Sequence, residues 1–123
     1  MKKILIIEDE NSLLEVWTIY LNKHTKKGEL KILSAVSIDE ARKVFNSNPD
    51  IDLIILDGYI KGPGERPNSL VLIPEFRKTY HGIIIASSSN EDHRSMMVAA
   101  GCDYDCKKDD VYKKIMEALE SKE

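Results

Sequence analysis

The sequence predicts an α/β fold in which a parallel five-stranded sheet is covered by helices on both faces. Short apolar runs alternate with segments of helical periodicity along the whole chain of 123 residues. The first run, residues 4–7, is β-branched and uninterrupted by polar residues, which is typical of a strand buried on both faces. Five such runs alternating with five helical segments imply right-handed crossovers between parallel strands.

Each element is located by its own pattern. Strands are expected at residues 4–7, 30–35, 53–56, 83–86 and 102–106. Helices are expected to follow the capping residues Asn11, Ser37 and Asn90, and also to cover residues 69–80 and 111–119. Ser37 and Glu40 have the spacing of a capping box, and Gly101 is expected to end the helix that Asn90 begins. Within residues 69–80, Pro74 should kink the helix unless the helix begins later.

Composition indicates one domain over residues 1–123, with a formal net charge of −3 and a pI near 5.7. Non-specific nucleic-acid binding requires a basic face, so no direct nucleic-acid binding is expected. The N-terminal apolar run has four residues, which is too short for a signal peptide or a membrane span. We therefore expect a cytoplasmic protein that does not associate with membranes.

The two cysteines are expected to be reduced. Cys102 and Cys106 lie four residues apart in the predicted fifth strand. An extended chain would separate their Cα atoms by roughly 13 Å, too far for a disulfide. We expect two small buried thiols.

Polar residues follow the predicted strands at one edge of the sheet. In chain order they are Glu8 and Asp9, Asp57, Ser87, and the pair Lys107 and Lys108. In open parallel sheets the functional crevice lies beyond the carboxyl ends of the strands. Clustered carboxylates repel one another unless a cation neutralises them, and oxygen ligands suit Mg²⁺, which also takes oxygens from phosphates. The sequence therefore predicts a Mg²⁺ site at this edge.

Four strings of the sequence together carry a family resemblance. They are KILIIEDE at residues 3–10, LIILD at 53–57, IIIAS at 83–87 and AGCDYDCKK at 100–108. No string is specific alone, but their order and spacing resemble the receiver domain of two-component response regulators over essentially the full chain. The resemblance implies a flavodoxin-like (βα)5 sandwich with strand order 2-1-3-4-5 and a role in phosphorelay signal transduction.

The resemblance also implies a role for each polar residue. Asp57 would be the phosphoacceptor, taking a phosphoryl group from a sensor histidine kinase or phosphotransfer protein. Asp9 and Asp57 would hold Mg²⁺ together with the backbone carbonyl of Tyr59, while Glu8 would act at the metal through water. Ser87 would bond a phosphoryl oxygen. Such a protein is not an enzyme with an external product, since it catalyses only its own phosphoryl transfer and a slow self-dephosphorylation.

Two alignments of the site lysine remain open. Counting without gaps from Gly101 makes Lys108 the site lysine and puts Asp105 where the family has its switch aromatic. Choosing Lys107 puts Tyr104 at that position but requires a shift of one residue. We favour Lys108, although the proline that usually follows the family's lysine is absent in either case.

Three further features bear on how the site works. Residues 58–68, a predicted loop, are longer than the family's connection after the phosphoacceptor, so we expect the opening of the site to be shaped differently. Tyr59 and Ser89 lie two residues after Asp57 and Ser87, at positions that tune the lifetime of the phosphoryl group in the family.

The leading hypothesis is a stand-alone phosphorylation switch that acts on an unknown downstream protein, with homodimer formation on phosphorylation as an open possibility. The alternative is a pseudo-receiver, a protein-interaction module that works without phosphorylation, which the unusual lysine context and the long loop favour. A phosphatase of the haloacid-dehalogenase type would need an aspartate at position 59, where this chain has Tyr59.

Overall fold

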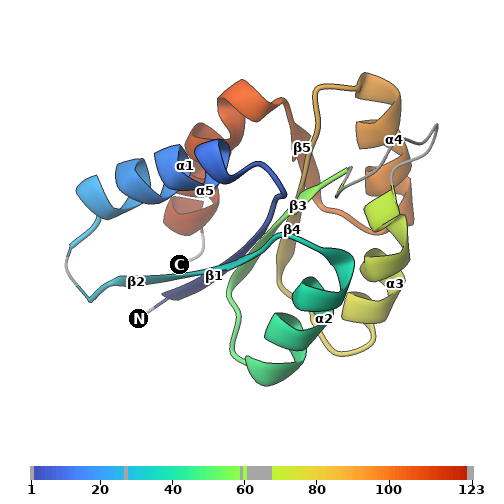
Figure 1. Ribbon diagram of the computed structural model, residues 1–123, viewed down its shortest axis with the longest axis horizontal. Helices are drawn as coiled ribbons and strands as arrows, with labels where there is room; N and C mark the ends of the chain where they lie inside the picture. Colours follow the sequence, from blue (N-terminus) through green and yellow to red (C-terminus); the bar gives the residue numbers. More distant parts are fainter. Residues whose placement is uncertain (1, 27, 59, 61–67, 122–123) are drawn as a thin grey trace.

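The computed structural model describes residues 2–26, 28–58, 60 and 68–121, in which strands and helices alternate (Figure 1). The strands are β1 (Lys2–Ile7), β2 (Leu30–Ala35), β3 (Leu53–Asp57), β4 (Ile83–Ser87) and β5 (Tyr104–Cys106). The helices are α1 (Asn11–Lys23), α2 (Ile38–Ser47), α3 (Leu72–Arg77), α4 (Glu91–Ala100) and α5 (Val111–Ser121). The 3₁₀ helices η1 (Asn68–Val71) and η2 (Lys108–Asp110) precede α3 and α5.

The five strands form one parallel sheet in the order β2-β1-β3-β4-β5, which confirms the predicted fold and strand order. From β1 the chain adds β2 on one side of the sheet and then β3 on the other, so the order of strand addition reverses next to β1. Ile7 of β1 pairs with Leu56 of β3, so Glu8 and Asp57 leave the sheet at neighbouring points. Ligand sites in doubly wound sheets form at this reversal, beyond the carboxyl ends of the strands.

Alternate residues of the internal strand β1 belong to two separate cores. Leu5 and Ile7 pack on the side of α2, α3 and α4, whereas Ile4 and Ile6 pack on the side of α1 and α5. Figure 1 shows these two groups of helices on opposite faces of the sheet. All four side chains are fully buried, which explains why the strand is apolar at every position.

The predicted helix over residues 69–80 is shorter than expected. The chain first forms η1, and α3 then covers only Leu72–Arg77. Pro74 is the third residue of α3, in the first turn, where the missing backbone N–H has no intrahelical partner to lose. The later start removes the kink that Pro74 would otherwise impose.

The capping predictions for Ser37 and Asn90 are confirmed. Ser37 Oγ accepts a hydrogen bond from Glu40 N at 3.1 Å, and Glu40 Oε1 accepts one from Val36 N at 2.9 Å. Asn90 Oδ1 accepts a bond from His93 N at 3.1 Å. These bonds satisfy donors that have no partner within the first helical turn.

The prediction that Asn11 caps α1 is wrong. Asn11 is the first helical residue, and the cap position belongs to Glu10, whose side chain makes no capping bond. The Glu10 carbonyl already accepts hydrogen bonds from Leu13 N and Leu14 N. Glu10 N donates to Glu8 Oε2 at 3.2 Å, which ties the start of α1 to the end of β1.

The fifth strand is shorter than predicted, because Cys102 lies before it. Cys102 N bonds the Met97 carbonyl at the end of α4, so this residue still belongs to the helix exit. Both Cys102 and Cys106 are buried free thiols, as expected. Burial raises the pKa of Cys106 to about 11, which keeps it protonated at neutral pH.

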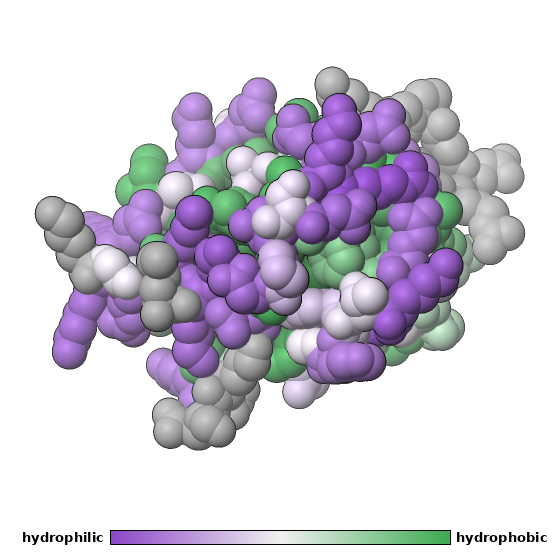
Figure 2. All heavy atoms as spheres, turned by 90° about the horizontal axis from the view of Figure 1, so that it is seen from below, coloured by the Kyte–Doolittle hydropathy of each residue, from purple (hydrophilic) through white to green (hydrophobic). Residues whose placement is uncertain are grey.

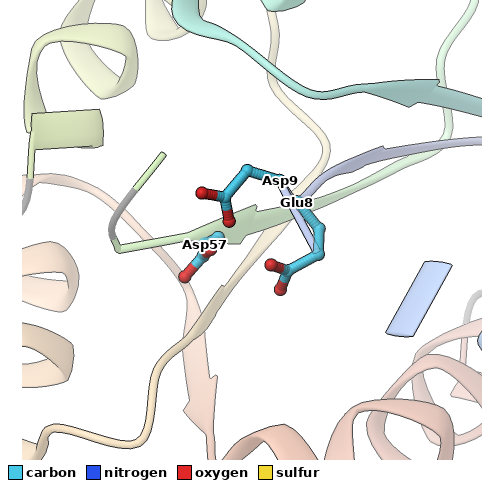
Figure 3. Close-up of side chains that lie close together, drawn as sticks. All are labelled: Glu8, Asp9 and Asp57. Carbon is cyan, nitrogen blue, oxygen red and sulfur yellow. The ribbon is translucent and has the colours of Figure 1, made fainter. Parts of the chain in front are cut away.

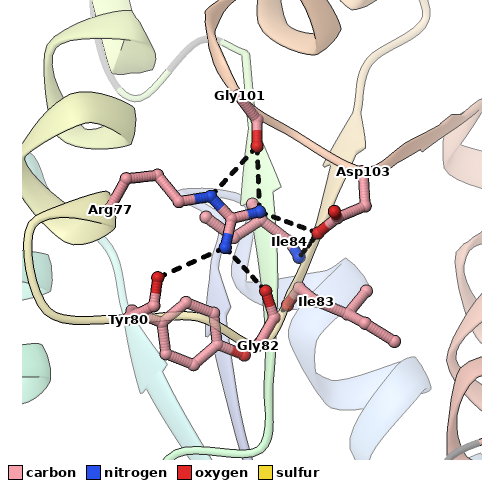
Figure 4. Close-up of polar contacts among 7 residues, drawn as sticks. All are labelled: Arg77, Tyr80, Gly82, Ile83, Ile84, Gly101 and Asp103. Carbon is pink, nitrogen blue, oxygen red and sulfur yellow. Dashed lines mark hydrogen bonds and ion pairs between the residues drawn. The ribbon is translucent and has the colours of Figure 1, made fainter.

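Arg77 organises the amino edge of the sheet near β4 and β5 (Figure 4). Its guanidinium donates to the carbonyls of Gly101, Gly82 and Tyr80, at distances from 2.6 to 3.4 Å. It also pairs with Asp103 Oδ2 at 2.7 Å. The side chain thus joins the end of α3 to the beginnings of β4 and β5.

Hydrophilic side chains predominate on the face of the molecule shown in Figure 2, and hydrophobic atoms show between them. Among the helices of the described chain, none combines the length and apolar character needed to cross a bilayer.

Candidate functional site

Three carboxylates meet at the carboxyl edge of the sheet (Figure 3). Glu8 and Asp9 follow β1, and Asp57 is the last residue of β3. One carboxylate oxygen from each lies within 4.8 Å of the other two. Glu8 is 2% exposed and Asp57 is 6% exposed, so the cluster is largely withdrawn from water. Burying so many like charges together is costly unless a cation balances them.

Lys108 supplies a positive charge to this cluster. Its ammonium lies 2.8 Å from Asp57 Oδ1 and forms a second ion pair with Glu8 Oε1. The ammonium also lies 6.0 Å from the centroid of the Trp17 ring, within the range of a cation–π contact. Lys107, one residue earlier, is exposed. Of the two candidate lysines, Lys108 is therefore the one that the fold brings to the acidic cluster.

Glu8 has a strongly perturbed carboxyl group. Burial raises its pKa from 4.5 to about 7, and the repulsion of Asp57 acts in the same direction. The hydrogen bond and the charge of Lys108 oppose this rise without cancelling it. One lysine therefore does not neutralise the cluster, and a further cation would favour the ionised form of Glu8.

Ser87 places a buried hydroxyl beside these charges. It is the last residue of β4, pairs in register with Asp57 and is 1% exposed. Within the described residues its Oγ has no hydrogen-bond partner. A buried hydroxyl without a partner is costly and is found where a ligand or water completes the bonding.

The backbone after Asp57 is held by Asn68 and Ser69. The Gly58 carbonyl accepts hydrogen bonds from the backbone N and the Oγ of Ser69, at 3.4 and 3.2 Å. The Asn68 side chain bonds the backbone N and carbonyl of Ile60, at 2.9 and 2.7 Å. These contacts fix both ends of the segment predicted as a loop, although most of residues 58–68 lies outside the described chain.

Three other predicted site residues, Asp105, Tyr104 and Ser89, belong to the described part of the chain. Asp105 is in β5, where its Oδ2 forms an ion pair with Arg94 Nε at 3.1 Å. Tyr104 is 51% exposed on the same strand, and Ser89 is exposed after β4. Tyr59, predicted to offer its carbonyl to the metal, lies outside the described residues.

Sequence reasoning missed Arg94, Ser69 and Asn68. Arg94 is 8% exposed, and its Nη1 donates to the Ser88 carbonyl at 2.8 Å. The only sequence signal for Arg94 is its place one turn after the cap Asn90, which says nothing of a contact with β5. Ser69 and Asn68 follow a glycine- and proline-rich segment, where hydrophilic residues are ordinary.

The donor set fits Mg²⁺. The ion prefers oxygen ligands at 2.0–2.1 Å, so opposite ligands of one ion are about 4.2 Å apart. The three carboxylate oxygens lie within 4.8 Å of one another, which is close to this span. The raised pKa of Glu8 and the Ser87 hydroxyl both mark a site whose bonding is incomplete.

Solved structures similar to this chain include receiver domains of response regulators. The chain is similar to the BeF3-activated N-terminal receiver domain of RstA from Klebsiella pneumoniae, at 20% identity and a TM-score of 0.76 over 98% of this chain and 97% of that one. A two-component response regulator from Clostridium difficile is 23% identical, with a TM-score of 0.76 over 98% of this chain and 97% of that one. The signal receiver domain of a DNA-binding response regulator from Colwellia psychrerythraea 34H is 22% identical, with a TM-score of 0.77 over 98% of this chain and 99% of that one.

At these identities the likeness establishes the fold, and this chain has the flavodoxin-like receiver fold over almost its whole length. No protein-family model and no curated protein sequence matches the chain.

Proposed function

We propose that this protein is a phosphorylation switch of a two-component system, with Asp57 as the phosphoacceptor. The observation that carries the proposal is the convergence of a buried Asp57, the Lys108 ammonium at 2.8 Å and a buried Ser87 hydroxyl with no partner among the described residues. A carboxylate nucleophile, a positive charge and a spare hydrogen-bond donor are the groups that phosphoryl transfer to an aspartate requires.

In the proposed reaction, an Asp57 oxygen attacks the phosphorus of a phosphohistidine. The new O–P bond forms as the P–N bond breaks, and the imidazole leaves with the electron pair. Lys108 neutralises charge on the phosphoryl oxygens from the position where it now pairs with Asp57. Ser87 donates its O–H, which has no partner among the described residues, to one of these oxygens.

Glu8, Asp9 and Asp57 would hold Mg²⁺, with Glu8 acting through a bound water and the carbonyl of Tyr59 as a further ligand. When bound, the ion would neutralise the transferring phosphoryl group and orient it for attack. Glu8 would then be ionised, because a nearby cation lowers the pKa that burial has raised.

The donor would be a sensor histidine kinase or a phosphotransfer protein, and the output a downstream protein or a homodimer that forms on phosphorylation. We place this exchange in the cytoplasm. Slow self-dephosphorylation would end the signal, at a rate set partly by Tyr59 and by the exposed Ser89.

Intact mass after incubation with Mg²⁺ and a small phosphodonor such as acetyl phosphate tests this proposal. The wild type should gain one phosphoryl group, and Asp57→Asn or removal of Mg²⁺ should abolish the gain. Asp52→Asn is a matched control: Asp52 is a partly buried carboxylate before β3, where it accepts a bond from Lys3 N, and its loss should leave the gain unchanged.

An unmodified wild type with several donors would overturn phosphoryl transfer. That result would favour the pseudo-receiver, a protein-interaction module that works without phosphorylation. A mass gain that persists in Asp57→Asn would place the phosphoryl group on another residue.

A further inference from the structure

Arg94 links the backbone beside the site to the surface of β5. Its Nη1 donates to the Ser88 carbonyl at 2.8 Å, and its Nε pairs with Asp105 Oδ2 at 3.1 Å. The side chain of Arg94 is 10% exposed, whereas that of Asp105 is 45% exposed. One nearly buried guanidinium therefore holds a backbone carbonyl at one end and a surface carboxylate at the other.

The backbone that Arg94 holds belongs to the connection between β4 and α4. Ser88 follows directly after Ser87, whose hydroxyl has no partner within the described chain. Ser88 N also donates to the Cys106 carbonyl at 3.2 Å, and Ser88 Oγ accepts a bond from Asn90 N at 3.1 Å. This connection is therefore held by β5 and by the start of α4, and the Ser87 carbonyl before it accepts a bond from Gly58 N at 3.2 Å.

We propose that Arg94 is a positioning residue that couples the site to β5: when Ser87 is drawn toward a phosphoryl group on Asp57, the Ser88 carbonyl leaves Arg94, and the Arg94–Asp105 ion pair rearranges. This inference rests on the proposed function and concerns its regulation. The signal that reaches β5 is then the change in the ion pair of Asp105, which lies next to the exposed Tyr104.

The Arg94 contacts oppose activation of the site. They stabilise the resting position of Ser88, so any ligand that draws Ser87 inward must first break the Arg94–Ser88 bond. Weakening either contact should shift the population toward the activated position and tighten binding of a phosphoryl mimic. A roughly fivefold change is expected, at the lower end of typical allosteric couplings.

The test is a binding titration with Mg²⁺ and beryllofluoride as the phosphoryl mimic. Trp17, the only tryptophan, is the fluorescent reporter because its ring lies 6.0 Å from the Lys108 ammonium. Asp105→Asn should lower the half-saturating beryllofluoride concentration by about fivefold. Asp50→Asn is the matched control, because Asp50 forms an exposed ion pair with Lys3 at 2.9 Å elsewhere in the molecule, and it should leave the midpoint unchanged.

A double-mutant cycle separates coupling through Arg94 from a direct effect across the sheet, since Asp105 pairs in register with Ala86 of β4. Arg94→Lys keeps the charge, but a single ammonium cannot reproduce the two-sided contact of the guanidinium. In the Arg94→Lys background, Asp105→Asn should have no further effect on the midpoint.

Additive effects of the two substitutions, or an unchanged midpoint in Asp105→Asn, would overturn the coupling while the wild type still binds the mimic. If the wild type neither binds beryllofluoride nor gains a phosphoryl group, the proposed function itself fails, and the coupling fails with it.

Discussion

The two edges of the sheet carry polar clusters of opposite character. At the amino edge, the Arg77 guanidinium bonds three backbone carbonyls and Asp103, and Asp103 in turn accepts a bond from Ile84 N at 2.9 Å. Charge and hydrogen-bonding groups are matched there. Such a cluster stabilises the fold.

At the carboxyl edge, the groups are not matched. Three carboxylates lie together, Lys108 contacts two of them, and burial raises the pKa of Glu8 to about 7. The Ser87 hydroxyl, buried beside them, has no partner in the described part of the chain. Matched polar clusters stabilise a fold, whereas unmatched ones are retained where a ligand completes them. The difference between the edges is what marks one of them as the candidate functional site.

The largest effect is expected from breaking the amino-edge cluster. Arg77→Met leaves three carbonyls and Asp103 without their donor, so the free energy of unfolding should fall by about 3 kcal/mol. Urea unfolding measures this loss. Arg42→Met is the control, because Arg42 pairs with Glu75 at the surface at 2.9 Å, and it should cost clearly less. Equal losses would mean that the Arg77 contacts add nothing beyond a surface ion pair.

A smaller effect with a distinct signature is expected at the carboxyl edge. Lys108→Met removes the ammonium that pairs with Glu8 and Asp57, and should lower the free energy of unfolding by about 2 kcal/mol at neutral pH without metal. Mg²⁺ should restore part of this loss, since the missing quantity is positive charge. Lys107→Met, at the exposed neighbouring position, should change little. A larger loss of unfolding free energy in Lys107→Met than in Lys108→Met would make Lys107 the site lysine.

A third expected effect is a dependence of stability on pH that Glu8 confers. Its pKa is about 7 in the folded protein against 4.5 for an exposed carboxyl, so the folded state binds the proton more tightly. Stability from this group is present below pH 4.5 and is lost as the pH rises through 7. Urea unfolding in EDTA should show this fall, and Glu8→Gln should flatten it.

Mg²⁺ should counteract the loss of stability that accompanies the ionisation of Glu8. At ten times its Kd the ion should add about 1.4 kcal/mol at a pH above 7, and less near pH 5, where Glu8 holds its proton. Equal stabilisation at both pH values would show that Glu8 does not take part in metal binding.

The sequence predicted the fold well because its determinants are local. The apolar run of β1 and the bounds of β2 follow from residue patterns, and the polar residues after β1, β3 and β4 indicated which edge would carry the site. The predictions that were wrong also concern local features, namely where two helices begin. Asn11 does not cap α1 because Glu10 already occupies that position, and α3 begins only at Leu72, which places Pro74 in its first turn.

The sequence by itself therefore determined the layers and the edge at which the carboxylates gather, and its family resemblance implied the strand order. Only the tertiary structure decided that Lys108 rather than Lys107 meets Asp57, that Arg94 joins Ser88 to Asp105, and that Glu8 is buried enough to hold a proton near neutral pH. Periodicity and strand ends depend on neighbouring residues. Ion pairs and burial depend on residues up to 100 positions apart, whose distances are set only when the sheet and its helices pack.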